Sequence, residues 1–223
     1  MCIRDRIRSR QAGRVLARFF DLLAGLQDRT PADAEFLYDA RTEDGALRLA
    51  NLRRYLELTA GATTLLVGEA PGWRGATITG VPFMSVRELT ARPGLLTGDP
   101  DGDGFALPPD PAAGWELSAS IVQKALRSWG EAPVNWPIYP NHPFRAPDRA
   151  TNRAPRTPEV AAGAEIALEL VAALGVRRVV AIGRKAEGAL AAAGIAATAV
   201  RHPAQGGAAL FAAQMAVLGR SAA

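Results

Sequence analysis

The sequence predicts an α/β fold: three layers, α/β/α, around a short central parallel sheet, with additional helices at the N-terminus. Apolar runs of strand length alternate with helical patterns from residue 63 onward, which is typical of a parallel sheet covered on both faces. Glycine or proline follows most of these runs and marks where each strand stops. The 223 residues, 48% hydrophobic and 22% charged, suffice for one domain with a full core.

The first sixty residues carry helical spacing of hydrophobic side chains. One helix is expected over residues 15–26, and another over 47–56, ending near Gly61. Between them, Pro31 follows a threonine and marks a helix start, so Ala34, Phe36 and Leu37 are expected to begin a further helix. We expect residues 1–60 to form an extension and helical segment packed on a main domain of residues 61–223.

The main domain contains the strands and helices that define the sheet. Strands are expected at residues 63–67, 133–139, 177–182 and 196–200. The proline within 133–139 restricts that strand, since proline cannot donate to a ladder. Helices are expected at residues 116–129, 157–174, 185–193 and 208–218, and residues 91–114 form a surface loop rich in Pro, Gly and Asp. In such a sheet the working groups lie beyond the carboxyl ends of the strands.

Composition and charge limit the class of protein. No apolar run reaches the roughly 18 residues of a membrane helix, and the start of the chain lacks the apolar segment of a secretory signal. The single cysteine, Cys2, excludes an internal disulfide and favours the cytoplasm. Abundant Ala and Arg with two Lys suggest a GC-rich bacterial genome.

The net charge of +4 is unevenly distributed. Residues 1–20 carry six Arg and one Asp, so the rest of the chain has a net charge of −1. The opening stretch resembles an extension added to the domain, and we base no functional inference on its charge. From residue 120 onward, 12 basic residues face six acidic ones. This basic half fits either a phosphate backbone or an ordinary solvated surface.

The turn after the first strand is Gly68-Glu69-Ala70-Pro71-Gly72. Its glycines and proline favour a tight turn with outward backbone N–H groups that could hold an oxygen-rich ligand. Glu69 is a candidate general base. Phe83 follows Gly-Val-Pro and could stack on a base, whereas most phenylalanines belong to the core. Taken alone, the turn is better explained as an ordinary connection between strand and helix.

Polar groups also follow the other strands. Asn135 offers an amide with donors and an acceptor, enough to recognise the edge of a pyrimidine, and Asn141 is a rival. The segment Arg201–Gly207 opens the last helix, where His202 could donate a hydrogen bond. Gly206 and Gly207 would let the backbone approach a ligand or DNA closely. Turn-forming asparagines and an incidental histidine at a helix entry are the simpler interpretations.

The stretch Asp99–Asp110 has the spacing of a calcium-binding loop. Prolines at its end, the missing glutamate at its last position and the absence of a preceding helical pattern favour an acidic turn instead. We therefore expect no metal ion there.

Six motifs, taken in chain order, resemble those of the uracil-DNA glycosylase superfamily, especially its bacterial family 4. They are GEAPG (68–72), GVPF (80–83), an asparagine at a strand end, NRAPRTPE (152–159), VVAIGRKAEGAL (179–190) and RHPAQGG (201–207). The resemblance covers roughly residues 63–215. It implies a DNA-binding face at the carboxyl ends of the strands. It also implies that Gly68, Ala70, Pro71 and Gly72 surround the base, while Glu69 and His202 take part in catalysis.

The resemblance assigns the remaining roles residue by residue. It implies that Phe83 stacks on the uracil, that Asn135 recognises its edge, and that Arg201, Gln205, Gly206 and Gly207 meet the DNA. The sequence departs from the family pattern in three ways. The four cysteines of the family 4 iron–sulfur cluster are missing, Ala70 replaces the acid that activates water in the best-known branch, and His-Pro-Ala replaces His-Pro-Ser.

The expected activity is therefore hydrolysis of the N-glycosidic bond of uracil, or a related deaminated base, in single- or double-stranded DNA. We expect a monomeric base-excision repair enzyme that needs no metal or organic cofactor and does not contact a membrane. A catalytically weak or inactive binder of damaged DNA and a hydrolase of free nucleosides or nucleotides remain alternatives. A purely structural role would leave the polar and glycine-rich motifs that follow the strands unexplained. Hypoxanthine, xanthine and mismatched thymine stay open as further bases.

Overall fold

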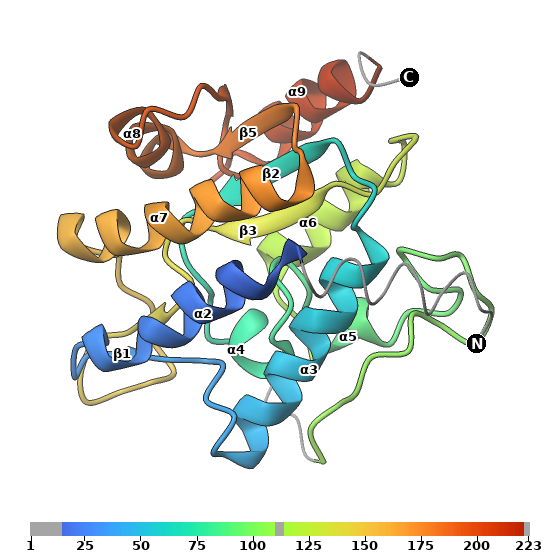
Figure 1. The fold of residues 1–223 in the computed structure, drawn as a ribbon. Helices are drawn as coiled ribbons and strands as arrows, with labels where there is room; N and C mark the ends of the chain where they lie inside the picture. The colour runs from blue at the N-terminus through green and yellow to red at the C-terminus, as the bar shows by residue number, and fades with distance from the viewer. Residues whose placement is uncertain (1–14, 110–113, 221–223) are drawn as a thin grey trace.

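A parallel four-stranded sheet forms the centre of the protein (Figure 1). The computed structural model describes residues 15–109 and 114–220. In chain order the elements are α2 (Ala17–Gly25), the 3-10 helix η1 (Gln27–Arg29), β1 (Ala34–Glu35), α3 (Glu43–Leu58), β2 (Thr64–Gly68), α4 (Ala76–Thr79), α5 (Val86–Leu89), α6 (Leu117–Leu126), β3 (Val134–Pro137), β4 (His142–Pro143), α7 (Thr157–Leu174), β5 (Arg178–Ile182), α8 (Arg184–Ala192), β6 (Thr198–Val200) and α9 (Ala208–Arg220).

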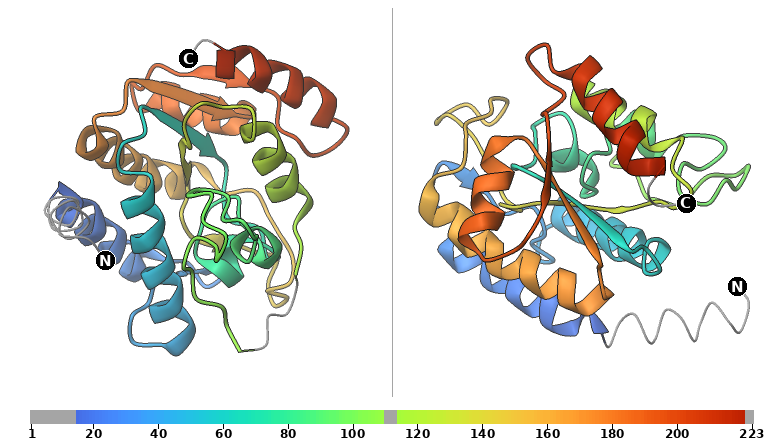
Figure 2. Two further views of the ribbon diagram at one scale, coloured as in Figure 1. Left: turned by 90° about the vertical axis from the view of Figure 1, so that its right-hand side faces the viewer. Right: turned by 90° about the horizontal axis from the view of Figure 1, so that it is seen from above.

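The sheet has the strand order β3-β2-β5-β6, with parallel pairing throughout. Helices α6 and α9 pack together on one side, while α2, α7 and α8 lie on the other (Figure 2). The predicted three-layer α/β/α fold is thus confirmed. The four predicted strands and the four predicted helices of the main domain all form, with ends shifted by a few residues.

Strand β2 shows why the sheet needs helices on both faces. All five of its residues are buried. Leu65 and Val67 belong to the larger hydrophobic core, which includes side chains of α2, α3, α7 and α8. Leu66 belongs to a second core with side chains of α6 and α9. Because side chains alternate along a strand, this division assigns opposite faces of the sheet to the two cores.

The prediction of a helix that begins at Ala34, Phe36 and Leu37 is wrong. Ala34 and Glu35 instead form β1, which pairs antiparallel with β4, and Leu37 is buried in the larger core. The partner strand lies more than 100 residues further along the chain, so local spacing of hydrophobic residues could not indicate it. The short helices α4 and α5 were also not predicted.

Helix α3 covers the outer edge of β3. The backbone N–H of Asn135 donates to the hydroxyl of Tyr55 at 2.6 Å, and that hydroxyl donates to the carbonyl oxygen of Pro133 at 3.3 Å. An edge strand otherwise leaves such groups unpaired. Helices α2 and α3 share the larger hydrophobic core with the sheet. The predicted boundary between a helical segment of residues 1–60 and a main domain of residues 61–223 stays a proposal. None of the helices in the described part of the chain has the length and apolar composition to cross a membrane.

Candidate active site

The segments that follow the four parallel strands meet at one edge of the sheet, because parallel strands all end on the same side. Glu69 follows β2, Ile138 follows β3, Gly183 follows β5 and Arg201 follows β6. The candidate residues therefore come from sequence positions more than 130 residues apart.

The ring of Phe83 lies directly on the backbone of Gly68. A Cβ atom added to Gly68 would be 2.6 Å from Cζ of that ring, so glycine is required for this close approach. Phe83 has a φ of 54°, in the left-handed region that residues with side chains rarely adopt. Its carbonyl oxygen accepts a hydrogen bond from Gln123 Nε2 at 3.1 Å, which fixes the loop against α6.

Asn135 shares a face of the sheet with this ring. Leu66 and Gly68 point to the same side of β2, and Asn135 stands beside Leu66 in the pairing of β2 with β3. The side chain is 1% exposed, and its Oδ1 has no hydrogen-bond partner among the described residues. A buried acceptor without a partner is costly and is expected to serve a purpose.

The rival asparagine, Asn141, has a different environment. Its Nδ2 donates to Thr30 Oγ1 at 2.8 Å and to the hydroxyl of Tyr139 at 3.4 Å, so it joins the N-terminal segment to the region after β3. Its Oδ1 also has no partner within the described residues.

Next to Asn141, His142 connects the GEAPG turn to a distant loop. Its Nδ1 lies 2.9 Å from the carbonyl oxygen of Pro71, and its Nε2 lies 3.0 Å from that of Arg149. Carbonyl oxygens only accept, so both contacts are hydrogen bonds when the ring carries both protons.

The carboxylate of Glu69 is paired with a lysine. Lys185, at the start of α8, places Nζ 3.0 Å from Glu69 Oε1, and the two side chains are 51% and 30% exposed. Lys185 is not among the site residues predicted from the sequence. A cation three residues after the end of a strand, at the same sheet edge as Glu69, is the signal that could have indicated it.

His202 lies beside Gly183, where an added Cβ would be 3.1 Å from the histidine Cβ. Its Nδ1 accepts a hydrogen bond from the backbone N–H of Ala204 at 3.1 Å, so the neutral ring carries its proton on Nε2. Burial lowers the pKa of His202 and outweighs the opposing effect of nearby Glu69. His202 is thus a neutral hydrogen-bond donor near pH 7.

The rest of the RHPAQGG segment forms a turn at the surface. Arg201, Gln205 and Gly206 are exposed, and both Gln205 and Gly206 have positive φ angles. Gly207 is buried against the carbonyl oxygen of His202, where a Cβ atom would overlap it. The backbone N–H of Arg201 donates to Gln214 Oε1 at 2.7 Å, and this residue is exposed.

A small cavity of about 40 Å³ lies between the GEAPG turn and Phe83. Its lining includes five predicted residues, Gly68, Glu69, Ala70, Pro71 and Gly72, together with Phe83. It also includes Glu116, which precedes α6 and was not predicted. Burial, and secondarily the charge of Glu88, raises the pKa of Glu116 to about 7. Asn135 and His202 do not line this cavity as it stands.

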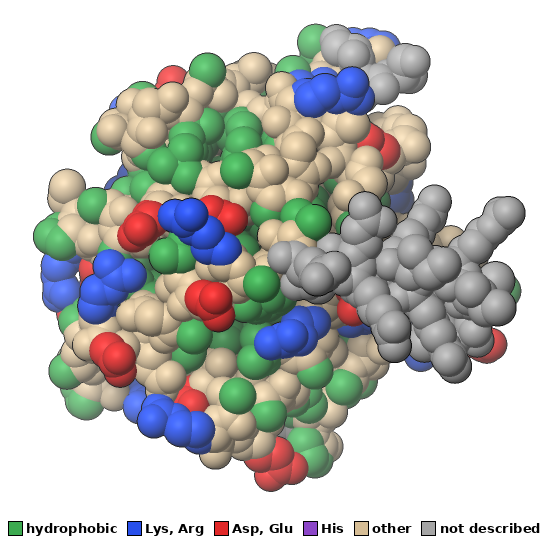
Figure 3. Space-filling model, in the orientation of Figure 1, with side chains coloured by type: hydrophobic (Ala, Val, Ile, Leu, Met, Phe, Trp, Pro, Cys, Tyr) green, Lys and Arg blue, Asp and Glu red, His purple; other side chains and the backbone are tan. Residues whose placement is uncertain are grey.

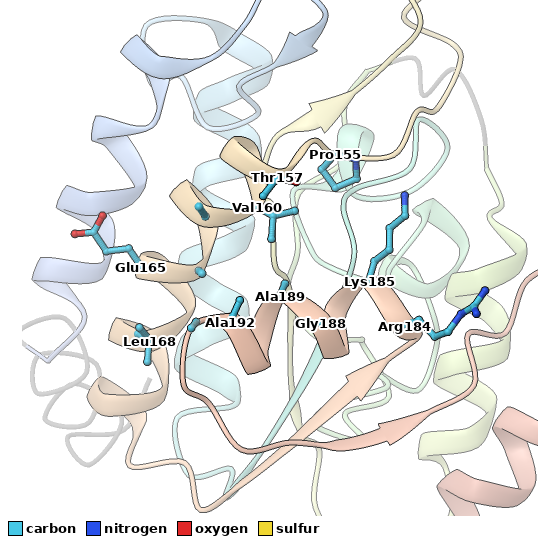
Figure 4. Close-up of a pocket in the computed structure, with 13 residues that line it drawn as sticks. Pro155, Thr157, Val160, Glu165, Leu168, Arg184, Lys185, Gly188, Ala189 and Ala192 are labelled. Carbon is cyan, nitrogen blue, oxygen red and sulfur yellow. The ribbon is translucent and has the colours of Figure 1, made fainter.

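A larger hollow of about 680 Å³ lies between α7 and α8. Figure 3 shows hydrophobic side chains gathered between these two helices, and Figure 4 shows small apolar residues such as Ala189 and Ala192 along it. Lys185 rises from the start of α8 toward Pro155, whereas the carboxylate of Glu165 turns away. Its polar lining residues are Thr157, Glu165, Arg184 and Lys185, and none of the residues predicted for the site lines it.

The acidic stretch 99–109 contains an internally bonded turn. The carboxylate of Asp103 is buried and accepts hydrogen bonds from the backbone N–H groups of Leu96 and Thr97 and from the Thr97 hydroxyl. The described residues hold no group of three or more potential metal ligands. Asp110, like Cys2, lies outside the described residues.

The NRAPRTPE segment anchors the N-terminal region. Arg153 pairs with Asp33 at 3.0 Å and with Glu159 at 2.6 Å, and Arg156 also pairs with Asp33. These pairs neutralise two arginines that were counted as possible phosphate contacts. Asn152 accepts a hydrogen bond from the backbone N–H of Trp73 at 3.1 Å and so connects this segment to the GEAPG turn.

The architecture belongs to a known class, the uracil-DNA glycosylase-like α/β/α fold. The chain is similar to the crystal structure of wild-type Pedobacter heparinus SMUG2, with a TM-score of 0.59 and 13% identity over 91% of this chain and 97% of that one. No protein-family model and no curated protein sequence matches the chain. At this identity the likeness establishes the fold.

Proposed function

We propose that this protein is a DNA glycosylase that hydrolyses the N-glycosidic bond of uracil, or of a related deaminated base, in DNA. Its structural neighbour SMUG2 is a member of the uracil-DNA glycosylase superfamily. The motif order and the shared fold support the same class of chemistry here. The reaction would begin base-excision repair, and we propose that a monomer carries it out with water as the only co-reactant.

The single observation that carries the proposal is that Phe83 and Asn135 share one face of the sheet, Phe83 against Gly68 at the end of β2 and Asn135 on β3 beside Leu66. An aromatic ring and a buried amide oxygen without a partner among the described residues, on one face of the sheet, suit a flat, hydrogen-bonding base. Phe83 would stack on the extruded ring, and the Asn135 amide would pair with uracil O4 and N3–H. Cytosine reverses this donor and acceptor pattern, so a fixed amide discriminates against it.

Glu69 and His202 would act on the bond that breaks. Negative charge develops on the departing base, and the Nε2–H of neutral His202 would stabilise it. Glu69 would orient water or stabilise the sugar cation, and its pairing with Lys185 would hold its carboxylate in place. Arg201 and the turn of Gln205, Gly206 and Gly207 would hold the flanking phosphates.

The test is incubation with a labelled oligonucleotide that holds one uracil, followed by alkali to cleave abasic sites. We expect cleavage by the wild type and a loss of about 10²–10⁴-fold in single-turnover rate for Glu69→Gln and about 10²–10³-fold for His202→Gln. Glu187→Gln is a matched control, since Glu187 is exposed on α8 and does not line the cavity. Absence of cleavage in single strands and in U:A and U:G duplexes would overturn the proposal for uracil.

One observation favours a second candidate, a binder of damaged DNA without catalysis. Lys185 neutralises Glu69, and position 70 is alanine, so the GEAPG turn offers a single, already paired carboxylate. Such a binder would retain uracil-containing DNA over matched thymine DNA in a gel-shift assay and leave no alkali-sensitive site. The glycosylase would give both retention and cleavage.

A further inference from the structure

Glu116 supplies a second carboxyl group to the cavity between the GEAPG turn and Phe83. Among the described residues that line this cavity, Glu69 and Glu116 have the polar side chains, and the others are glycine, alanine, proline and phenylalanine. Glu116 occupies the position before α6 where a side chain often caps the helix, yet it makes no capping hydrogen bond. Its carboxyl group reaches toward the GEAPG turn instead.

Two glycines make room for that carboxyl group. A Cβ atom on Gly72 would overlap Glu116 Oε1, and a Cβ atom on Gly75 would overlap Oε2. Both oxygens thus lie against the backbone of the GEAPG turn and of Gly75 just after it. These contacts hold the side chain in place but provide no positive charge to pair with its carboxyl group.

No hydrogen bond or ion pair joins this carboxyl group to another residue in the described ranges. Its acidic neighbour Glu88 differs, because it accepts hydrogen bonds from the backbone N–H and the hydroxyl of Ser85 and from the Ser120 hydroxyl at 2.8 Å. The Glu88 carboxyl group therefore has hydrogen-bond donors beside it, whereas the Glu116 carboxyl group faces the cavity without one among the described residues.

The surrounding charges favour a proton on Glu116. Glu88 approaches from α5, and Glu69 lines the same cavity from the end of β2 with its charge already paired to Lys185. Arg74 stacks on Trp73 and is exposed. On α6 itself, Lys124 is exposed two turns further along. Burial and Glu88 together account for the raised pKa of about 7.

We infer that Glu116 is a base-contacting residue that acts with its carboxyl group protonated, donating a hydrogen bond to a carbonyl oxygen of the base in this cavity. The inference rests on the proposed glycosylase function and adds a specificity-determining residue to it. Deamination converts an amino group of a base into a carbonyl oxygen, and an O–H donor recognises that oxygen directly. No proton leaves Glu116 in this role.

The same geometry predicts how pH affects recognition. Below about pH 7 the protonated carboxyl group donates to the carbonyl oxygen; above it, the ionised form repels that oxygen, and the protonated fraction falls tenfold per pH unit. His202 does not produce this alkaline loss, since burial lowers its pKa and the ring is already neutral above pH 7. Glutamine at position 116 keeps a donor at every pH.

The experiment compares the wild type, Glu116→Gln and Glu116→Ala between pH 6 and 9. One readout is the single-turnover rate on a uracil oligonucleotide, and the other is the affinity for the same sequence with a non-hydrolysable 2′-fluoro-deoxyuridine. We expect both to fall about tenfold from pH 8 to pH 9 in the wild type and to stay level in Glu116→Gln. Glu116→Ala should be weaker at pH 6 and independent of pH. Glu187→Gln should follow the wild type.

The outcomes separate this inference from the proposed function. Cleavage with identical pH profiles for the wild type and Glu116→Gln would overturn the role of Glu116 and leave the glycosylase standing. Uracil binding that follows the expected pH pattern without cleavage would support Glu116 and overturn hydrolysis. Absence of both uracil binding and cleavage at every pH would overturn both. Gly72→Ala, which displaces the carboxyl group, should reproduce the loss seen in Glu116→Ala.

Discussion

Single residues at the end of β2 set the shape of the candidate site. Gly68 has no side chain where the Phe83 ring lies, and Gly72 has none where the Glu116 carboxyl group lies. The glycines of the GEAPG motif are thus needed because a side chain at either position would overlap a neighbouring side chain. A tight turn would by itself favour glycine there, but the packing adds a specific reason at each position: the Phe83 ring at Gly68 and the Glu116 carboxyl group at Gly72.

Gly68→Ala should displace Phe83. The added Cβ would stand 2.6 Å from the ring, so the ring or the strand must move, and we expect a loss of about 1–3 kcal/mol in the free energy of unfolding. KM for uracil DNA should rise because the stacking surface shifts. The control is Gly188→Ala on α8, where nothing lies within 4 Å of the new atom and helix propensity should raise stability by up to about 1 kcal/mol. Denaturant unfolding compares the two, and equal stabilities would contradict the prediction.

At the scale of elements, short strands and ion pairs join the N-terminal segment to the main sheet. Strand β1 pairs with β4, and Asp33 beside it accepts a hydrogen bond from the backbone N–H of Phe144 through its own carbonyl oxygen. The Asp33 carboxylate meets Arg153 and Arg156 near the start of α7. This arrangement holds the region after β3 against the first helices.

Asp33→Asn should weaken that connection. Hydrogen bonds from Arg156, and secondarily from Arg153, lower the pKa of Asp33 from 3.8 to about 2. A lowered carboxyl pKa stabilises the fold above about pH 4, and the contribution disappears as the pH falls toward 2. We expect Asp33→Asn to unfold about 1 kcal/mol more easily at pH 7 and to match the wild type near pH 2. Asp21→Asn, on the exposed surface of α2, should change neither value. A constant difference at all pH values would contradict the assignment.

The sequence predicted elements whose signals are local. The apolar run before Gly68 indicated β2, and the pattern ending before Gly175 indicated α7, since burial and capping depend on neighbouring residues. It failed at Ala34, whose strand partner is distant. For the same reason it identified Glu69 but neither Lys185 nor Glu116, because their meeting depends on the assembled sheet and not on their own segments.

At the scale of the whole molecule, basic side chains gather after the parallel strands. Six of them are exposed at the carboxyl edge of the sheet: Arg74, Arg145, Arg149, Arg184, Lys185 and Arg201. The loops that follow the four strands hold fewer acidic residues, Glu69 and Asp148. The overall charge of +4 hides this local excess, which would attract a phosphate backbone to the edge that holds the site.

Removing these charges should change the salt dependence of DNA binding. We expect Arg201→Gln and Arg184→Gln each to weaken binding to any sequence and to lower the slope of log K against log salt by about 0.7–0.9 per lost phosphate contact. Arg127→Gln is the matched control, since Arg127 is exposed at the end of α6 away from that edge. Fluorescence anisotropy between 50 and 200 mM salt measures the slopes. An unchanged slope for Arg201→Gln and Arg184→Gln would remove this edge from consideration as the DNA-binding face.

The bond between Asp33 and Arg153 joins residues 120 positions apart in the chain. During synthesis on the ribosome, Asp33 emerges long before its arginines, and β1 emerges before β4. Strand β1 therefore has no partner strand, and the Asp33 carboxylate has no arginine partner, until the segment up to residue 159 has been synthesised. Stalled or truncated products that end before α7 would present an exposed strand edge to chaperones and proteases. Once the NRAPRTPE segment has been synthesised, its arginines can pair with Asp33 and hold the N-terminal segment in the fold.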